Sequence, residues 1–169
     1  MNKWLITLTT TLVVLVVAAF ALHREQRVER SVDIAAPPEK VWSVLTEFAA
    51  YPEWNPFMRE ASGTPKEGEK LRIVLNSGDS EMTFTPTVLA AEPGKELRWL
   101  GRVFVPGLLD GEHSFTLTPI PGGVRLTQSE TFSGALVPFF GGSIDVGDDF
   151  AAMNRALRDR VESTANIAR

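Results

Sequence analysis

Length, composition and charge exclude several classes of protein. The chain has 169 residues, a formal net charge of -4, no cysteine and two histidines. This length suits one domain with a full hydrophobic core. A disulfide framework, a cysteine nucleophile and a multi-histidine metal site are excluded. The acidic balance and the lack of any Lys/Arg run argue against nucleic acid as a partner. We therefore expect no metal, no cofactor and no nucleic acid.

An uncharged stretch lies at the start of the chain, over residues 4–22 (WLITLTTTLVVLVVAAFAL). As a helix it would span about 28 Å, close to the hydrocarbon thickness of a bilayer. One interpretation is a transmembrane helix that anchors the protein, and the other is a signal peptide cleaved near Ala21. The apolar run reaches His23 without a polar segment, which favours the anchor. We expect a single-pass membrane protein, with a secreted or periplasmic protein as the alternative.

The charges that flank this stretch leave the side of the membrane open. Lys3 precedes it, whereas Arg24 and Arg27 follow it, and the positive-inside rule then favours a cytoplasmic domain. A signal peptide would place the domain outside. In either case residues 1–22 form the anchor or signal, 23–26 a linker, 27–165 the domain and 166–169 a tail.

The first part of the domain alternates between strand and helix signals. Residues 26–34 predict a strand, which the prolines at 37 and 38 end. A proline in the first turn starts a helix well, and Val41, Leu45 and Phe48 give that helix an apolar stripe. Residues 51–58 (YPEWNPFM) contain two prolines and predict a short aromatic turn.

A run of strands follows the aromatic turn. Alternation of apolar and polar residues predicts strands over 58–62, 70–75, 81–91, 96–104, 111–119 and 123–133. Pro86 lies inside one of them and indicates an edge position or a bulge. The connections have hairpin lengths, so we expect a single antiparallel sheet.

The last long element is a helix over residues 148–163. Phe150, Met153, Leu157 and Val161 form one apolar stripe at helical spacing, and charged residues take the other face. A stripe of this length needs a wide apolar surface, which the sheet supplies. The sequence thus predicts an α+β fold in which the helix and the curved sheet enclose a space.

Three stretches carry a resemblance to a known family. They are I-x-A-P-P-x-x-V-W-x-V-L at 34–45, YPEWNPF at 51–57, and the antiparallel sheet followed by the long helix. Over about 27–165 the chain resembles the START / polyketide cyclase / birch-pollen-allergen-like superfamily (SRPBCC). The segments 82–102, 105–117, 132–140 and 153–162 are similar to a bacterial branch of it. The resemblance implies the helix-grip fold, in which a curved antiparallel sheet wraps a long C-terminal helix around a cavity. It implies a cavity more strongly than a reaction, because members include lipid carriers, cyclases, hydratases, hormone receptors and chaperone activators.

The final hairpin holds the best polar candidates for a site. His113 shares one face of its strand with Phe115 and Leu117, and Gln128 and Glu130 share one face of the next strand. Antiparallel pairing places His113 near Gln128 or Glu130, depending on the register. Such a group serves as a polar pair inside the sheet, as a recognition group for a ligand, or as an acid/base pair.

Apolar residues that could line the cavity complete the predicted ligand-binding set. Besides the three polar residues, the candidates are Trp54, Phe57, Trp99, Phe104, Phe115, Phe132, Phe139 and Met153. Two connecting segments, 103–109 and 134–142, are unusually apolar for loops. They either fold onto the core as lids or form the rim of an apolar cavity.

These observations support three hypotheses about function. The first is a membrane-tethered or exported domain that binds a hydrophobic small molecule or lipid in the space between sheet and helix. The second is a polyketide cyclase or dehydratase with His113 and Glu130 as acid and base. The third is an interaction module similar to the chaperone-activating relatives. We expect a binding protein rather than an enzyme and assign no catalytic residue; the sequence does not identify a protein partner.

Overall fold

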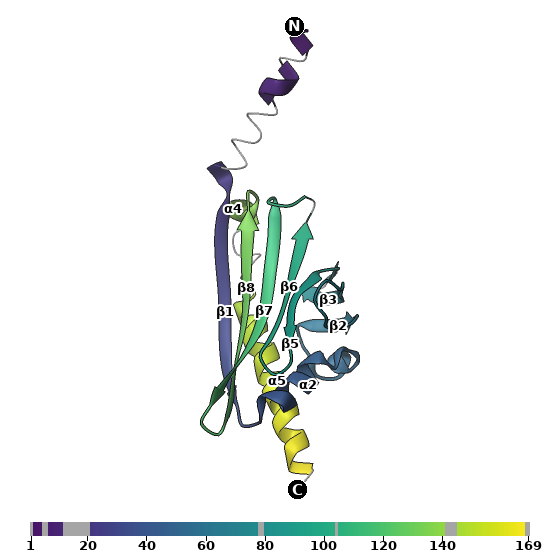
Figure 1. The fold of residues 1–169 in the computed structure, drawn as a ribbon, viewed down its shortest axis with the longest axis vertical. Coiled ribbons are helices and arrows are strands. Elements are labelled where there is room, and N and C mark those ends of the chain that lie inside the picture. The colour runs from purple at the N-terminus through teal and green to yellow at the C-terminus, as the bar shows by residue number, and fades with distance from the viewer. Residues whose placement is uncertain are drawn as a thin grey trace.

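The fold consists of two antiparallel sheets and a long C-terminal helix (Figure 1). The structure is a computed structural model that describes residues 2–4, 7–11, 21–77, 80–103, 105–140 and 145–167. The strands are β1 (Arg24–Ile34), β2 (Met58–Ser62), β3 (Arg72–Ser77), β4 (Ser80–Phe84), β5 (Thr87–Glu92), β6 (Glu96–Val103), β7 (Leu109–Ile120) and β8 (Gly123–Gly134). The helices are α2 (Pro38–Thr46), η1 (Phe48–Ala50), α3 (Tyr51–Trp54), α4 (Val137–Phe140) and α5 (Gly147–Ile167).

The strands form two sheets, and the prediction of a single sheet was therefore wrong. One sheet has the order β1-β8-β7-β6-β5 and the other the order β2-β3-β4. The strand predicted over 81–91 is divided at Pro86, with β4 ending at Phe84 and β5 beginning at Thr87. Proline has no N–H to donate to a ladder, so pairing stops there. An isolated bridge still joins the two sheets: Lys70, just before β3, pairs with Thr87, the first residue of β5.

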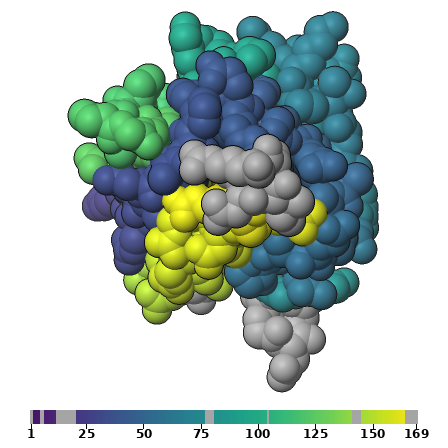
Figure 2. Space-filling view, turned by 90° about the horizontal axis from the view of Figure 1, so that it is seen from below, coloured from purple at the N-terminus to yellow at the C-terminus, as the bar shows by residue number. Residues whose placement is uncertain are grey.

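Helix α5 packs across the large sheet, as its apolar stripe predicted. Phe150, Met153, Leu157 and Val161 are all fully buried in the main core. Full burial of such side chains contributes about 1.5–3 kcal/mol each. The helix contacts β1, β8, α2 and α3. In Figure 2, which looks at the end of the molecule where α5 finishes, the yellow helix lies among the blue segments that include α2.

The segment between β1 and β2 closes one end of this core. Helix α2 begins with Pro38 at its first position, and its buried Val41 and Leu45 join the core. The hydroxyl of Tyr51 donates a hydrogen bond of 2.7 Å to the carbonyl oxygen of Leu45. Burial of this ring raises the pKa of Tyr51 well above its usual range. The sequence YPEWNPF therefore forms a packed turn, as predicted.

The predicted membrane span lies mostly outside the described residues. Residues 5, 6 and 12–20 belong to that stretch and are not described. Within the ranges given above, no helix combines the length and the apolar character that crossing a bilayer requires.

Candidate functional site

Three polar side chains meet on the inner face of the large sheet. In the pairing of β7 with β8, His113 lies directly across from Glu130, and Gln128 lies across from Phe115. Nδ1 of His113 is hydrogen-bonded to Oε2 of Glu130. Nε2 of Gln128 lies 3.2 Å from Nε2 of His113. The register thus places both sequence candidates against the histidine, Glu130 directly and Gln128 diagonally.

This chain of hydrogen bonds sets the tautomer of His113. A carboxylate oxygen of Glu130 accepts, so Nδ1 of the ring carries the proton. Nε2 then accepts from the side-chain amide of Gln128. The Oε1 atom of Gln128 is buried and has no hydrogen-bond partner among the described residues. Both ring nitrogens of His113 are therefore engaged, and the oxygens of Glu130 and Gln128 remain as acceptors.

Aromatic side chains enclose the imidazole. The Trp99 ring stacks on it with a centroid distance of 4.9 Å and an interplanar angle of 6°. Phe115 lies at 4.8 Å, and Phe150 of α5 contacts the ring edge-on at 5.1 Å. His113 is buried, whereas the Glu130 side chain keeps 15% of its surface exposed. Hence His113 orients Glu130, and Glu130 is the more exposed member of the pair.

A pair of glycines makes room for that carboxylate. Gly101 of β6 and Gly111 of β7 are paired in the register. A Cβ atom on Gly111 would lie 2.5 Å from Oε1 of Glu130. A Cβ atom on Gly101 would meet only the Gly111 carbonyl oxygen, at 3.8 Å. The Glu130 carboxylate thus occupies space above the sheet that any side chain at 111 would take.

A surface hollow of about 370 Å³ opens beside this glycine pair. It is lined by residues 82–85, at the end of β4, and by 101–103, at the end of β6. Met82 in its wall is 48% exposed. Gly101, which lines the hollow, is paired with Gly111, and Oε1 of Glu130 lies over Gly111. The exposed apolar wall and the carboxylate together form the candidate site.

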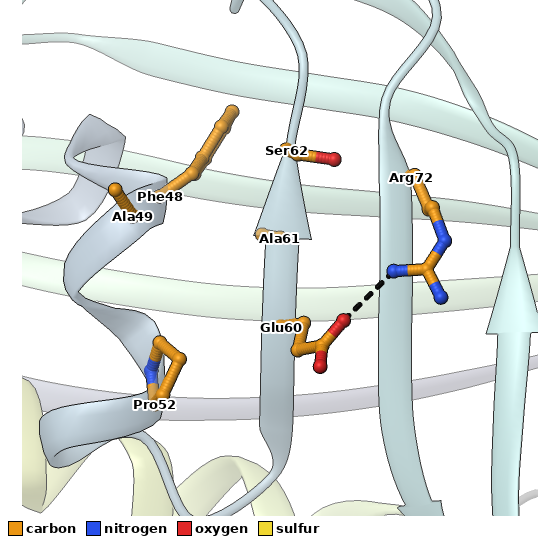
Figure 3. Close-up of a pocket in the computed structure, with 7 residues that line it drawn as sticks. All are labelled: Phe48, Ala49, Pro52, Glu60, Ala61, Ser62 and Arg72. Atoms are coloured by element: carbon orange, nitrogen blue, oxygen red, sulfur yellow. Dashed lines mark hydrogen bonds and ion pairs between the residues drawn. The ribbon is translucent and has the colours of Figure 1, made fainter.

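A second hollow, of about 240 Å³, lies on another surface (Figure 3). Residues of η1 and α3 form one wall, and Glu60 of β2 pairs with Arg72 of β3 at 2.8 Å on the other. Both charged side chains are more than half exposed, and such pairs contribute little. None of its lining residues is paired with the strands that carry His113 and Glu130, so we assign no site to it.

Apolar side chains of the large sheet and of α5 pack against each other in the region where the sequence predicted a cavity. Trp99, Phe115, Phe150 and Met153 are buried there, in one continuous core. Aromatic side chains from both layers meet across the interface, with Phe150 of α5 against His113 of β7.

The structure brings together six of the predicted site residues. These are Trp99, His113, Phe115, Gln128, Glu130 and Met153. Phe57 is connected to them through the Phe150 ring, at a centroid distance of 5.7 Å. Trp54 packs instead on Tyr51, and Phe132 belongs to a separate small cluster. Phe139 is largely exposed on α4, and Phe104 lies outside the described residues.

Sequence reasoning missed three residues of the site. Phe150 was recognised as part of the helix stripe, but its contact with His113 depends on how α5 lies on the sheet. Gly101 and Gly111 have no side chain that would attract attention. Their signal is the presence of two glycines at inward-facing positions of neighbouring strands, where larger residues normally pack.

We expect Gly111→Ala to displace the Glu130 carboxylate, because the added methyl group would lie 2.5 Å from Oε1. The hydrogen bond to His113 should weaken, and the ¹⁵N chemical shift of Nδ1 should move. Gly101→Ala is the matched control, since its methyl group meets one atom at ordinary contact distance. Equal spectra for the two variants would contradict the placement of Glu130 over Gly111.

The fold and the enclosed polar group define the chain as a helix-grip protein. It belongs to the family described as polyketide cyclase / dehydrase and lipid transport, whose model matches residues 25–164. The resemblance inferred from the sequence is thereby confirmed. No curated protein matches the chain.

Solved structures share this fold. A Mesorhizobium loti protein is 28% identical, with a TM-score of 0.61 over 83% of this chain and 98% of its own. The ZhuI aromatase/cyclase from Streptomyces sp. R1128 is 16% identical, with a TM-score of 0.65 over 82% and 94%. A START superfamily protein from Mycobacterium smegmatis is 21% identical, with a TM-score of 0.65 over 82% and 98%. At these last two identities the likeness concerns the fold.

Proposed function

We propose that this chain is a binding domain for a hydrophobic small molecule or lipid that carries a hydrogen-bond donor. The observation that carries the proposal is the Glu130 carboxylate, which is held by buried His113 and lies over Gly111, the strand partner of Gly101 in the wall of a partly apolar hollow. The apolar body of the ligand would lie against Met82 and Val103. Its donor group would bind Glu130.

The size and chemistry of the hollow support this proposal. Its volume of about 370 Å³ is in the range of small-molecule pockets, roughly 300–1,000 Å³. Such sites combine apolar walls with a few placed polar groups. The polar group here is an acceptor, so a ligand with a hydroxyl or amine fits better than a carboxylate. The family description, which includes lipid transport, is consistent with this class of ligand.

We further propose that the uncharged stretch over 4–22 holds the domain at a membrane. Its length without charge supports a single span. The charges that flank this stretch would decide on which side of the membrane the domain lies. Cleavage near Ala21 would instead release a secreted or periplasmic domain. Labelling of the mature N-terminus distinguishes the tethered form from the cleaved form.

Two other functions keep one observation each. The hydrogen bond between His113 and Glu130 favours an enzyme of the cyclase or dehydratase type. Against it, both nitrogens of His113 are engaged and the ring is buried. The continuous apolar core between the large sheet and α5 favours an interaction module. Binding remains the better proposal because the accessible group is a single oriented carboxylate beside a hollow.

Glu130→Gln is expected to weaken binding of 1-naphthol about tenfold. A hydrogen bond to a carboxylate contributes about 1.5–3 kcal/mol and a neutral one about 0.5–1.5 kcal/mol, and each 1.4 kcal/mol is tenfold in affinity. Binding of naphthalene, which has no hydroxyl group, should be unchanged. The measurement is a titration followed by the fluorescence of the aromatic probe.

The control for this titration is Glu112→Gln. Glu112 lies on the same strand as His113 but on the opposite face, where it pairs with Arg98. This variant should bind both probes as the parent chain does. Equal loss of naphthol binding in the two variants, or no binding of either probe to the parent chain, would refute the proposed site.

A further inference from the structure

The two apolar connecting segments form a single unit at one end of the large sheet. The backbone N–H of Leu136 donates to the carbonyl oxygen of Leu108 at 2.9 Å, and that of Ala135 donates to Gly107 at 3.1 Å. Gly134 allows this approach, because it has a φ of 137° and a Cβ atom there would lie 2.3 Å from the Leu108 oxygen. The segment after β6 and the segment after β8 are therefore fixed to each other.

This unit has a buried side and an exposed side. Leu109 and Val137 are buried, with Phe132 and Leu136 packed against them, in a cluster separate from the main core. On the other side three apolar side chains face outward: Val105 at 57% exposure, Phe139 at 69% and Phe140 at 39%. We call these three residues the α4 tip. Phe139 and Phe140 lie in the same short helix as Val137, which is buried in this cluster.

The α4 tip lies at the end of the domain where β1 begins (Figure 1). Arg24, the first residue of β1, is paired with Gly134, which is followed within three residues by α4. Helix α4 also contacts β1. The uncharged stretch over 4–22 ends two residues before Arg24. The most apolar part of the sequence and the exposed apolar tip therefore share one end of the molecule.

We propose that the α4 tip inserts into the surface of a lipid bilayer. A chain held by residues 4–22 presents this end to the membrane, and exposed Phe and aliphatic side chains bury favourably at the boundary between headgroups and acyl chains. The inference rests on the tethering part of the proposed function. A second protein copy is a poorer occupant: a Phe buries about 150–250 Å², so two partly exposed Phe and one Val fall short of the roughly 800 Å² per partner of a stable interface.

Contact through the α4 tip would also bring the hollow close to lipid. Val103 lines the hollow and lies two residues before Val105 in the chain. A ligand dissolved in the bilayer then has a short path to the hollow without crossing water. The ligand class this favours is a membrane-soluble molecule with one hydrogen-bond donor.

The absence of cysteine from the chain allows a direct test with the full-length protein. Phe139→Cys is labelled with an environment-sensitive nitrobenzoxadiazole dye, and the chain is reconstituted into phosphatidylcholine/phosphatidylglycerol vesicles. We expect a several-fold rise in emission and strong quenching by nitroxide-labelled lipid chains. Pro121→Cys is the matched control, because Pro121 is exposed in the turn between β7 and β8 at the far end of the sheet. Its label should show neither effect.

Each outcome decides the inference. If the chain binds the vesicles but both labels report water, the contact of the α4 tip with the bilayer is overturned and the tether stands. A chain that stays out of the vesicles would overturn both tether and tip contact. Protection of the Phe139→Cys label without lipid, rising with protein concentration, would overturn the inference in favour of a second copy. The naphthol titration is unaffected by these results, so failure of the tip and failure of the ligand site are distinguishable.

Discussion

Replacing Phe150 with alanine is expected to lower the free energy of unfolding by about 3–5 kcal/mol. The ring is fully buried at the start of α5. It contacts Phe57 at a centroid distance of 5.7 Å and His113 at 5.1 Å. These neighbours come from the turn before β2 and from β7, so the ring joins three separate segments. Its loss leaves a cavity that none of them can close by a side-chain rotation alone.

The same substitution at Phe139 provides the control. This ring is 69% exposed on α4, so Phe139→Ala should change stability in detergent solution by less than about 0.5 kcal/mol. Both variants are measured by urea unfolding of the full chain, followed by far-ultraviolet circular dichroism. Because a domain of this kind is stable by only about 5–15 kcal/mol, the Phe150→Ala midpoint should move clearly. A loss below about 1 kcal/mol would mean that α5 does not seat on the sheet through Phe150.

The position of Phe150 also shows what a sequence can predict. The stripe that contains Phe150, Met153, Leu157 and Val161 is local information, because a helix repeats every 3.6 residues and the apolar face must be buried. All four residues are fully buried as the stripe predicted. The packed aromatic turn, which rests on Pro and Asn chemistry, follows from equally local signals.

Other features depend on information that lies outside any local pattern. Whether His113 faces Gln128 or Glu130 depends on a strand register, and a shift of two residues preserves the same face. The division of the sheet at Pro86 was predicted only as an edge or a bulge, because the effect of one missing N–H depends on what lies beside it. The space that Gly111 leaves is occupied by Glu130, which reaches across from β8. Such an arrangement appears only once strands are paired.

Asn55 carries the second large expected effect. Its side-chain Oδ1 accepts the backbone N–H groups of Phe57 at 3.0 Å and of Met58 at 2.9 Å. All three residues are buried. Asn55→Ala would leave two buried donors unpaired, each costing about 1–3 kcal/mol. For the two donors together we expect a loss of about 2–6 kcal/mol in the free energy of unfolding.

The chain offers a matched control for this loss. Asn76 is exposed, and its side-chain amide donates a hydrogen bond of 3.3 Å to the carbonyl oxygen of Pro56. Asn76→Ala should therefore change stability by less than about 0.5 kcal/mol. Hydrogen exchange of the Phe57 and Met58 amides gives the local measurement, and both should exchange much faster in Asn55→Ala. Unchanged exchange would show that other groups hold this turn.

Asn55→Asp separates the hydrogen bonds from the rest of the side chain. The aspartate keeps an oxygen where both N–H groups donate, and it loses only an Nδ2 atom that has no partner among the described residues. Two backbone donors also favour the charged carboxylate. This variant should retain more stability than Asn55→Ala at neutral pH. Because Phe57 contacts Phe150, and Phe150 contacts His113, the turn that Asn55 holds also supports the ring that orients Glu130. Asn55→Ala should accordingly weaken naphthol binding as well as the fold, whereas Asn76→Ala should affect neither.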